Sequence, residues 1–143
     1  YNMTDLQASI GLHQLHKLEK NWIRRQELWL RYNQAFSDLP LDLPSPVDTS
    51  IRHAYHLYAI RVQQSASIDR DTLLQRLYEK KIGTGVHYTA LHLHPYYSET
   101  YGYKRGDFPN AEQIGDTTLS IPLSAALTDD DVSDVVDAVR DCF

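Results

Sequence analysis

The stretch that decides the fold is TDLQASIGLHQLHKLEKNWIRRQELWLRYNQAFS, Thr4–Ser37. It contains no proline, and Gly11 is its only glycine, so no strong helix breaker interrupts it. Thr4 and Gln7 have the spacing of a capping box, which marks the start of a helix. Bulky apolar residues then recur at steps that place them on one stripe of a helix: Leu15, Leu18, Trp22, Trp29, Tyr32 and Phe36. We predict one long helix and treat residues 1–38 as a separate unit.

This helix is too long for a chain of this size. About 33 residues at about 1.5 Å each extend about 50 Å, whereas a compact domain of 143 residues has a radius of gyration of about 14–15 Å. The apolar residues of its first half also lie on several sides: Leu6, Ala8, Ile10, Gly11, Leu12 and Leu15. Because such a helix is normally buried on several sides, we expect further protein or a partner subunit to cover this half.

Residues 39–143 alternate between strand and helix patterns. LPLDLPSP, residues 39–46, is a connector punctuated by prolines. HAYHLYAIRV, residues 53–62, predicts a central strand, with His56 and Tyr58 as core residues whose polar tips are hydrogen-bonded. Asp69 caps a helix that stops at Gly83. TGVHY, residues 84–88, is predicted as a short strand.

A histidine- and tyrosine-rich loop follows, and Pro109 fits the first turn of a short helix. LSIPLS, residues 119–124, alternates as a strand does. Thr128 caps a final helix that carries Val132, Val135, Val136 and Val139. This order of elements predicts an α/β fold, a small α+β sandwich of one sheet with helices, preceded by the long helix.

Composition excludes several classes of protein. Apolar residues make up 42% and charged residues 23%, which is typical of a globular chain. A net charge of −5 argues against a nucleic-acid groove, and no apolar run approaches the roughly 20 residues that span a bilayer. The single cysteine, Cys142, fits a reducing cytoplasm. Ten tyrosines and seven histidines beside three phenylalanines suit half-buried walls that face a polar ligand.

The stretch KIGTGVHYTALHLHPYY, Lys81–Tyr97, raises the question of chemistry, because it holds three imidazoles. A zinc or iron site is disfavoured, since Glu79 is the only carboxylate or thiol between Asp71 and His94. No serine lies in a glycine elbow, and no glycine-rich phosphate loop is present. The lysines lie on polar faces, at a helix end or in a polar loop, so none suits a Schiff base. We expect no metal and no catalytic residue here, only a polar aromatic wall.

Five segments together carry a resemblance. In order and spacing they are similar to the C-terminal portion of the DegT/DnrJ/EryC1/StrS family of pyridoxal-phosphate (PLP) sugar aminotransferases: YNMTDLQASIGLHQLHKLEK, RHAYHLYAIRV, KIGTGVHYTALHLHPYY, FPNAEQIGDTTLSIPL and LTDDDV. The resemblance covers nearly the whole chain. It is greatest to the branch that makes 4-amino-4-deoxy-arabinose on UDP.

The resemblance implies a cytoplasmic fold-type-I homodimer that serves cell-envelope polysaccharide biosynthesis. In such an enzyme a large domain holds PLP through a lysine Schiff base, and an amino group passes from glutamate to a keto group of a nucleotide sugar. That domain is expected upstream of this sequence, since the chain opens on YNMTDLQ without an initiator methionine. Residues 1–38 are then an interdomain helix and residues 39–143 a small C-terminal domain. We expect this chain alone to be inactive.

The resemblance also implies site residues. Asn2 is a candidate contact to the PLP phosphate of the opposite subunit. His87, Tyr88 and His92 border the sugar-nucleotide pocket, and Arg52 suits a bidentate contact to a nucleotide phosphate. For Arg52 an exposed loop arginine is an equal alternative. For the whole chain the alternative is a stand-alone module that binds a small ligand and dimerises through its long helix.

Overall fold

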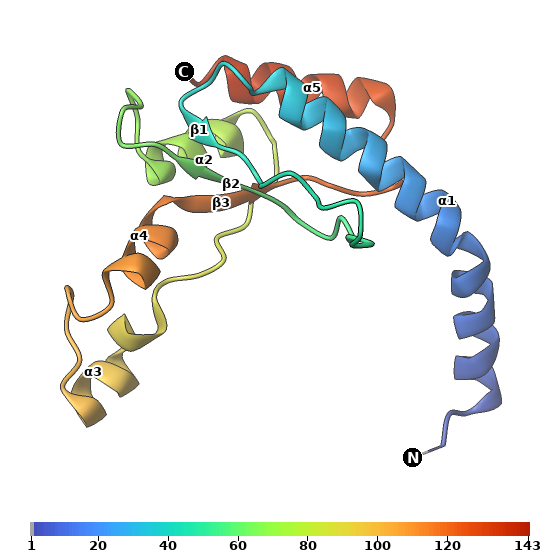
Figure 1. Ribbon diagram of the computed structural model, residues 1–143, viewed down its shortest axis with the longest axis horizontal. Helices are drawn as coiled ribbons and strands as arrows, with labels where there is room; N and C mark the ends of the chain where they lie inside the picture. Colours follow the sequence, from blue (N-terminus) through green and yellow to red (C-terminus); the bar gives the residue numbers. More distant parts are fainter. Residues whose placement is uncertain (1) are drawn as a thin grey trace.

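The computed structural model describes residues 2–143, and the predicted long helix is present in it as α1, Asp5–Ala35 (Figure 1). Its capping box is formed: the Thr4 hydroxyl accepts from the Gln7 amide, and the Gln7 side chain accepts from the Thr4 amide. Figure 1 shows that α1 changes direction partway, so that its N-terminal half runs away from the rest of the chain.

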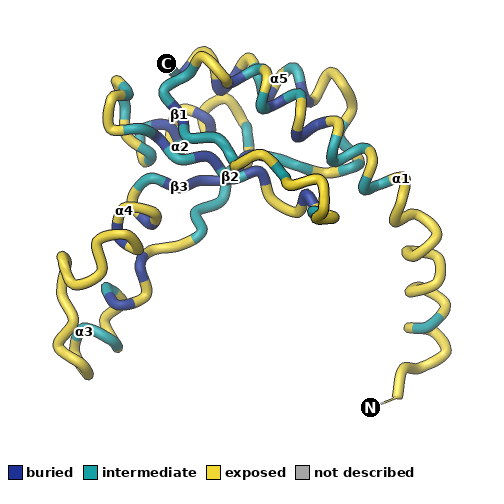
Figure 2. The backbone as a smooth tube through the Cα atoms, viewed as in Figure 1, coloured by how far each residue is buried: buried dark blue, intermediate teal, exposed yellow. Residues whose placement is uncertain are grey.

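Only the C-terminal half of α1 is buried, as Figure 2 shows. Leu28, Trp29 and Tyr32 enter the core there, together with Phe36 just beyond the helix. The large apolar residues of the first half are exposed, namely Leu6, Ile10, Leu12, Leu15 and Leu18, as is Met3 just before the helix. The predicted excess of apolar surface is therefore real, and none of residues 2–143 covers it.

A small antiparallel sheet forms the centre of the fold. β1, Leu41–Asp42, pairs with β2, Tyr58–Val62, and β2 pairs with β3, Thr118–Ile121. Alternate residues of β2, namely Tyr58, Ile60 and Val62, are buried, which is the period of two that a strand with one covered face shows. The α/β prediction, one small sheet with helices, is confirmed.

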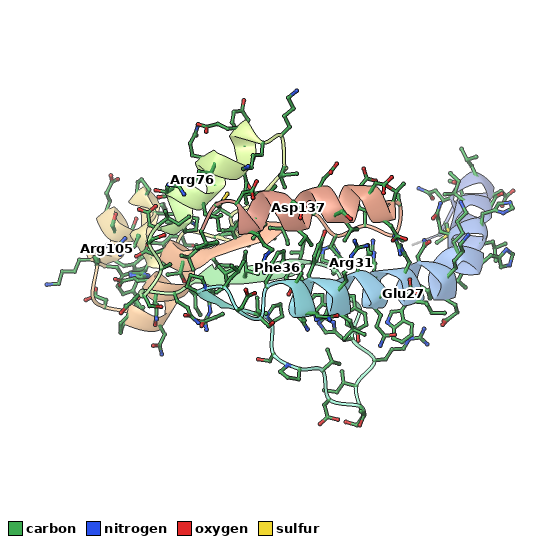
Figure 3. All side chains as sticks on the ribbon, turned by 90° about the horizontal axis from the view of Figure 1, so that it is seen from above. Glu27, Arg31, Phe36, Arg76, Arg105 and Asp137 are labelled. Atoms are coloured by element: carbon green, nitrogen blue, oxygen red, sulfur yellow. The ribbon has the colours of Figure 1, made fainter. Side chains whose placement is uncertain are left out.

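Helices pack on the core side of this sheet. α2, Arg70–Glu79, contributes Leu73 and Leu77, and α5, Asp129–Arg140, contributes Val132, Val135, Ala138 and Val139. Figure 3 shows α1 and α5 side by side with Arg31 between them. The Arg31 guanidinium donates to the Ser133 hydroxyl at 2.8 Å, and Arg24 lies 2.7 Å from Asp129. These contacts join the buried half of α1 to α5.

The remaining elements lie on the side of the sheet away from α5 (Figure 1). They are the 3₁₀ helix η1, Leu91–Leu93, α3, Pro95–Tyr101, and α4, Pro109–Thr117. In Figure 1 these elements and the N-terminal half of α1 project from the same side of the sheet, away from α5. No helix within residues 2–143 is both long enough and apolar enough to cross a membrane.

The structure corrects several sequence predictions. The connector 39–46 contains β1, and the loop after residue 88 contains η1 and α3. The predicted strand 53–62 begins only at Tyr58, because Tyr55 has a left-handed φ of 47° and cannot continue an extended strand. His56 is therefore exposed, so its prediction as a core residue was wrong. Tyr58 is buried as predicted, and its hydroxyl donates to Asn33 Oδ1 at 2.7 Å.

The predicted strand 84–88 is also wrong. Only Gly85 pairs with the sheet, through one isolated bridge to Ser120. No other residue of 84–88 pairs with β3, so this segment leaves the sheet directly after Gly85.

Candidate functional site

The segment from Gly85 to His92 crosses the free edge of β3. Gly85 and Ser120 exchange two backbone hydrogen bonds, of 3.0 and 2.8 Å. His87 then folds back so that its Nε2 lies 2.8 Å from Ser120 Oγ. A Cβ at Gly85 would lie 2.7 Å from His87 Nε2 and 3.1 Å from Ser120 Oγ. Glycine is therefore required at position 85 for the imidazole to sit on the serine.

His87 retains one unused ring nitrogen. Its Nδ1 is buried and has no hydrogen-bond partner among the described residues. Its ring packs edge-on against Tyr88, with 5.1 Å between centroids, and the Tyr88 side chain is 74% exposed. Tyr88 thus presents a phenol to solvent, while His87 lies behind it.

α4 holds the next residues of this segment. A Cβ at Gly115 would lie 2.8 Å from Tyr88 O and 3.0 Å from Ala90 N, both backbone atoms. This close approach needs a residue without a side chain on α4. The segment after His87 is therefore pressed against α4 rather than free in solvent.

His92 and Glu112 form a pair at the junction of η1 and α4. Burial raises the pKa of the Glu112 carboxyl, but hydrogen bonds from the Gly106 amide, the His92 ring and the Phe108 amide together outweigh it and hold the pKa below its ordinary value. The carboxylate is therefore the stable form. Because His92 Nε2 is occupied by this contact, its placement favours a role in holding the segment in place.

An aromatic surface continues from this pair along α3 and the loop after it. We call it the α3 aromatic surface: Tyr96, Tyr97, Tyr101, Tyr103 and Phe108, whose neighbouring rings lie about 5–6 Å apart. Phe108 packs on His92, with 4.9 Å between centroids. α3 has no buried residue, so most of this surface faces solvent.

The predicted site residues fall into three places. His87, Tyr88 and His92 lie on the one segment described above. Arg52 lies against α1 instead, where its Nη2 donates to Glu19 at 2.6–2.7 Å. Asn2 is exposed beside the N-terminal end of α1, which Figure 1 places far from the sheet.

Two partners of these residues were missed from the sequence. Ser120 occupies one face of β3, opposite the core-facing Leu119 and Ile121, so the alternation of LSIPLS carried a signal. Glu112 follows Pro109 by three residues, which places it at the end of the first turn of α4. A buried glutamate there needs partners from outside the helix.

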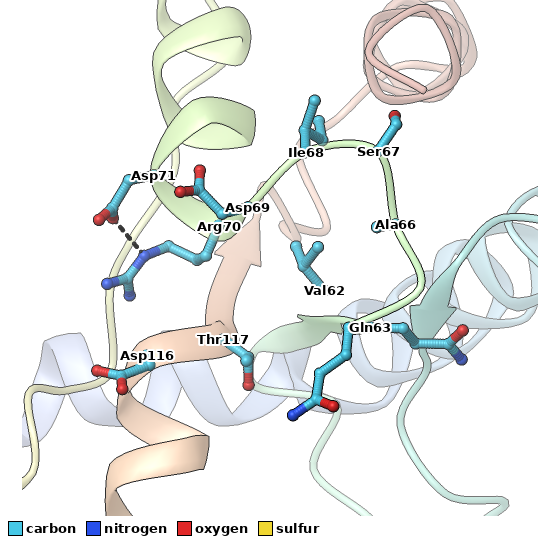
Figure 4. Close-up of a pocket in the computed structure, with 11 residues that line it drawn as sticks. Val62, Gln63, Ala66, Ser67, Ile68, Asp69, Arg70, Asp71, Asp116 and Thr117 are labelled. Carbon is cyan, nitrogen blue, oxygen red and sulfur yellow. Dashed lines mark hydrogen bonds and ion pairs between the residues drawn. The ribbon is translucent and has the colours of Figure 1, made fainter.

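A cavity between β2, α2 and α4 contains several charged side chains but no free cation to bind a ligand (Figure 4). Arg70 Nη1 donates to the Gly115 and Thr118 carbonyls, both at 3.1 Å, and its Nε donates to Asp71 at 2.6 Å. Arg70 therefore ties α2 to the junction of α4 and β3. This contact holds α4 beside the sheet. From there Glu112 pairs with His92, and Gly115 lies against the backbone of Tyr88 and Ala90.

The lysines of the described residues lie outside the segment from Gly85 to His92. All five lysines are exposed: Lys17, Lys20, Lys80, Lys81 and Lys104. Lys20, Lys80 and Lys81 border surface pockets but remain exposed there. Within residues 2–143 no three His, Cys, Asp or Glu side chains cluster as metal ligands do. What the arrangement offers is a wall of imidazole and phenol groups held in place by Ser120, Gly115 and Glu112.

Comparison with known proteins agrees with this architecture. The model of the DegT/DnrJ/EryC1/StrS aminotransferase family matches residues 1–140. The spore coat polysaccharide biosynthesis protein SpsC of Bacillus subtilis is 45% identical over 142 residues, which cover 98% of this chain and 36% of SpsC.

Two solved structures share the fold. The aminotransferase TlmJ from Streptoalloteichus hindustanus superposes with a TM-score of 0.84 at 35% identity, over 98% of this chain and 36% of TlmJ. Spr1654 from Streptococcus pneumoniae, in its PMP form, gives 0.87 at 27% identity, over 99% of this chain and 35% of Spr1654. The chain thus spans little more than a third of each relative. It belongs to the DegT/DnrJ/EryC1/StrS aminotransferase family.

Proposed function

We propose that this chain is the C-terminal portion of a PLP-dependent aminotransferase, which transfers an amino group from glutamate to a keto group of a nucleotide-linked sugar. One observation carries the proposal: the family match covers residues 1–140, while the chain spans only 36% of SpsC. The role of SpsC in polysaccharide biosynthesis supports a sugar substrate, and the PMP form of Spr1654 supports the cofactor. UDP is the proposed nucleotide, as in the branch that makes 4-amino-4-deoxy-arabinose.

A large domain would supply what residues 2–143 do not. It would carry the lysine that holds PLP, and the exposed apolar residues of the first half of α1 would rest on it. The parent enzyme would act as a cytoplasmic homodimer, in which Asn2 would contact the PLP phosphate bound by the opposite subunit. Residues 1–38 would then be the interdomain helix and residues 39–143 the small domain. PLP supplies the electron sink for the reaction when it is bound.

The residues of this chain would bind and orient the sugar nucleotide. The exposed Tyr88 phenol would hydrogen-bond to a hydroxyl or phosphate oxygen, since a phenol both donates and accepts. His87 would pack against the Tyr88 ring and so keep it in position. His87 itself is held by its contact with Ser120, for which Gly85 leaves room. His92 would border the pocket and hold its wall in place through Glu112. Arg52 would meet a phosphate group.

The experiment compares this chain with the polypeptide encoded when its reading frame is extended upstream. Each is mixed with glutamate, PLP and a UDP-linked 4-keto sugar, and aminated product is measured. We expect turnover by the longer polypeptide and none by this chain.

In the longer polypeptide, Tyr88→Phe should raise KM. Tyr78→Phe, which changes an equally exposed tyrosine on α2, should not raise it. Turnover by this chain alone contradicts the proposal. A start codon at its first residue favours the stand-alone binding module.

A further inference from the structure

Ser120 is a buried hydroxyl residue of β3, with 6% of its surface exposed. Its Oγ lies 2.8 Å from His87 Nε2 and 3.4 Å from Gly85 O. A hydroxyl carries a single proton, so Ser120 can donate to only one of these two groups at a time. The direction of this hydroxyl therefore decides which nitrogen of the His87 ring carries the ring proton.

The two directions differ in how many hydrogen bonds they make. If Ser120 donates to His87 Nε2, the ring proton lies on Nδ1, a buried atom without a partner among residues 2–143. If Ser120 donates to Gly85 O instead, Nε2–H donates to Ser120 Oγ, and both protons are used. A buried N–H without an acceptor is also rarer in folded proteins than an acceptor with an unused lone pair. The second arrangement is therefore favoured, with hydrogen bonds running from His87 through Ser120 to Gly85.

Gly85 leaves the imidazole little freedom to move on this serine. Gly85 and Ser120 exchange two backbone hydrogen bonds, so the two residues are fixed beside one another. A Cβ at Gly85 would lie 2.7 Å from His87 Nε2 and 3.2 Å from His87 Cε1. The ring thus fills the space above the glycine, and its position is defined by Ser120.

The position of the Tyr88 phenol depends in turn on His87. The Tyr88 backbone is fixed on α4, since a Cβ at Gly115 would lie 2.8 Å from Tyr88 O. The Tyr88 ring meets the His87 ring edge to face, with 5.1 Å between centroids and 89° between planes. Within residues 2–143, His87 is the one aromatic neighbour of this otherwise exposed ring. A change in the imidazole is therefore passed to the phenol.

We propose that Ser120 is a positioning residue, which fixes the Nε2–H tautomer and the orientation of His87 and thereby sets where Tyr88 presents its phenol. Ser120 is buried whereas the phenol faces solvent, so the effect passes through the imidazole. The consequence for binding of a sugar nucleotide rests on the proposed function. The tautomer of His87 and the placement of Tyr88 do not.

The first test uses NMR on the 143-residue chain. The nitrogen shifts of the His87 ring identify the protonated nitrogen, and the ring signals of Tyr88 report its surroundings. We expect one tautomer, Nε2–H, in the unmodified chain. Ser120→Ala removes the acceptor of that proton, so both tautomers should be populated and the Tyr88 signals should move. Thr118→Val is the matched control, because it removes a buried hydroxyl of β3 that has no partner among the described residues.

A second variant displaces the imidazole without removing the hydroxyl. Gly85→Ala places a Cβ against His87 Nε2, so the Tyr88 signals should move as they do in Ser120→Ala. The combined variant should move them no further, since both changes break one contact. Gly83→Ala, whose Cβ would meet nothing within 4 Å, is the control. Urea unfolding shows which variants are folded, and either Ser120→Ala or Gly85→Ala alone decides the question.

The longer polypeptide tests the consequence for the reaction. Ser120→Ala should raise KM about fivefold, as the loss of an ordinary hydrogen bond does, with kcat nearly unchanged. It should add nothing to the effect of Tyr88→Phe, because it acts through the same phenol. Thr118→Val should leave KM unchanged.

Each contrary result is distinct. A proton on Nδ1 of His87 in the unmodified chain overturns the tautomer and with it the proposal. Unmoved Tyr88 signals in folded Ser120→Ala or Gly85→Ala overturn the positioning role. A KM effect that adds in full to that of Tyr88→Phe means that Ser120 acts by another route. If the Tyr88 signals move as expected while the longer polypeptide shows no amino transfer, the proposed function fails and the positioning of Tyr88 stands.

Discussion

His92 Nε2 lies 2.8 Å from Glu112 Oε1, and the two side chains are only 7% and 8% exposed. The same carboxylate accepts hydrogen bonds from the Gly106 amide at 2.8 and 3.0 Å and from the Phe108 amide at 3.3 Å. His92 and Phe108 lie at the two ends of the excursion that contains α3. One buried carboxylate therefore fixes both ends of a segment that has little other attachment to the fold, since α3 buries no residue.

We expect Glu112→Gln to loosen this excursion while the core stays folded. A glutamine offers one acceptor oxygen instead of two and adds an NH₂ group that cannot accept from the Gly106 or Phe108 amides. Without the charge-assisted contacts, local opening of this segment costs less free energy. Hydrogen exchange of the Gly106 and Phe108 amides should therefore become at least about tenfold faster. Glu99→Gln, an exposed change on α3, is the control. Unchanged protection of the Gly106 amide would show that other contacts hold the segment.

The helices that begin with a side-chain cap were the part of the fold that sequence alone predicted well, whereas η1 and α3, which have no such cap, were missed. Thr4, Asp69 and Thr128 cap α1, α2 and α5 with their own side chains, so each signal is local. The strands were harder because a strand exists only against a partner. Two-residue β1 has no periodicity to detect, and the run 84–88 failed because only Gly85 finds a partner.

The candidate site divides in the same way. Sequence located the histidine- and tyrosine-rich segment, since residue type alone marks it as polar and aromatic. It did not locate Ser120 or Glu112, which act through contacts over 33 and 20 residues of chain. It also did not indicate that Arg25 and Arg52 border one groove, because the two residues come together only when the segment before β2 packs on α1.

Two glycine substitutions should have opposite effects. Gly11 is an exposed interior position of α1 with nothing within 4 Å of a new Cβ, so Gly11→Ala should stabilise the chain by about 0.5–1 kcal/mol. Gly115→Ala would push a Cβ against the Tyr88 and Ala90 backbone and should cost about 1–3 kcal/mol. Urea unfolding measures both. The NMR signals of Tyr88 should also move in Gly115→Ala, and a stable variant with unmoved signals would argue against the close contact.

Two buried tyrosines predict the response to alkaline pH. The Tyr32 hydroxyl donates to Pro122 O and the Tyr58 hydroxyl to Asn33 Oδ1, and both side chains are fully buried. Burial raises the pKa of Tyr32 to about 12, and burial, together with the proximity of Tyr32, raises the pKa of Tyr58 further. Because both values lie above the unfolded value, about 10, the stability from neutral tyrosine is complete below about pH 10 and is lost as pH rises through the folded values.

The free energy of unfolding should therefore be level up to about pH 10 and fall beyond it. Tyr58→Phe should cost about 1–2 kcal/mol at neutral pH, since Asn33 Oδ1 loses its donor, and its alkaline loss should be shallower. Tyr78→Phe, which changes an exposed phenol, is the matched control. Urea unfolding over a series of pH values gives both quantities. An alkaline loss as steep in Tyr58→Phe as in the unmodified chain would mean that other groups cause it.

The two halves of α1 should respond differently to the same substitution. Leu28 is 1% exposed in the core, so Leu28→Ala should cost about 3 kcal/mol through lost burial and a cavity. Leu15 is 68% exposed, so Leu15→Ala should change stability by less than about 0.5 kcal/mol. Urea unfolding and sedimentation at several concentrations check this. If Leu15→Ala costs as much as Leu28→Ala and the effect grows with concentration, a second copy of the chain covers this face. A small effect at every concentration leaves the face free for the proposed large domain.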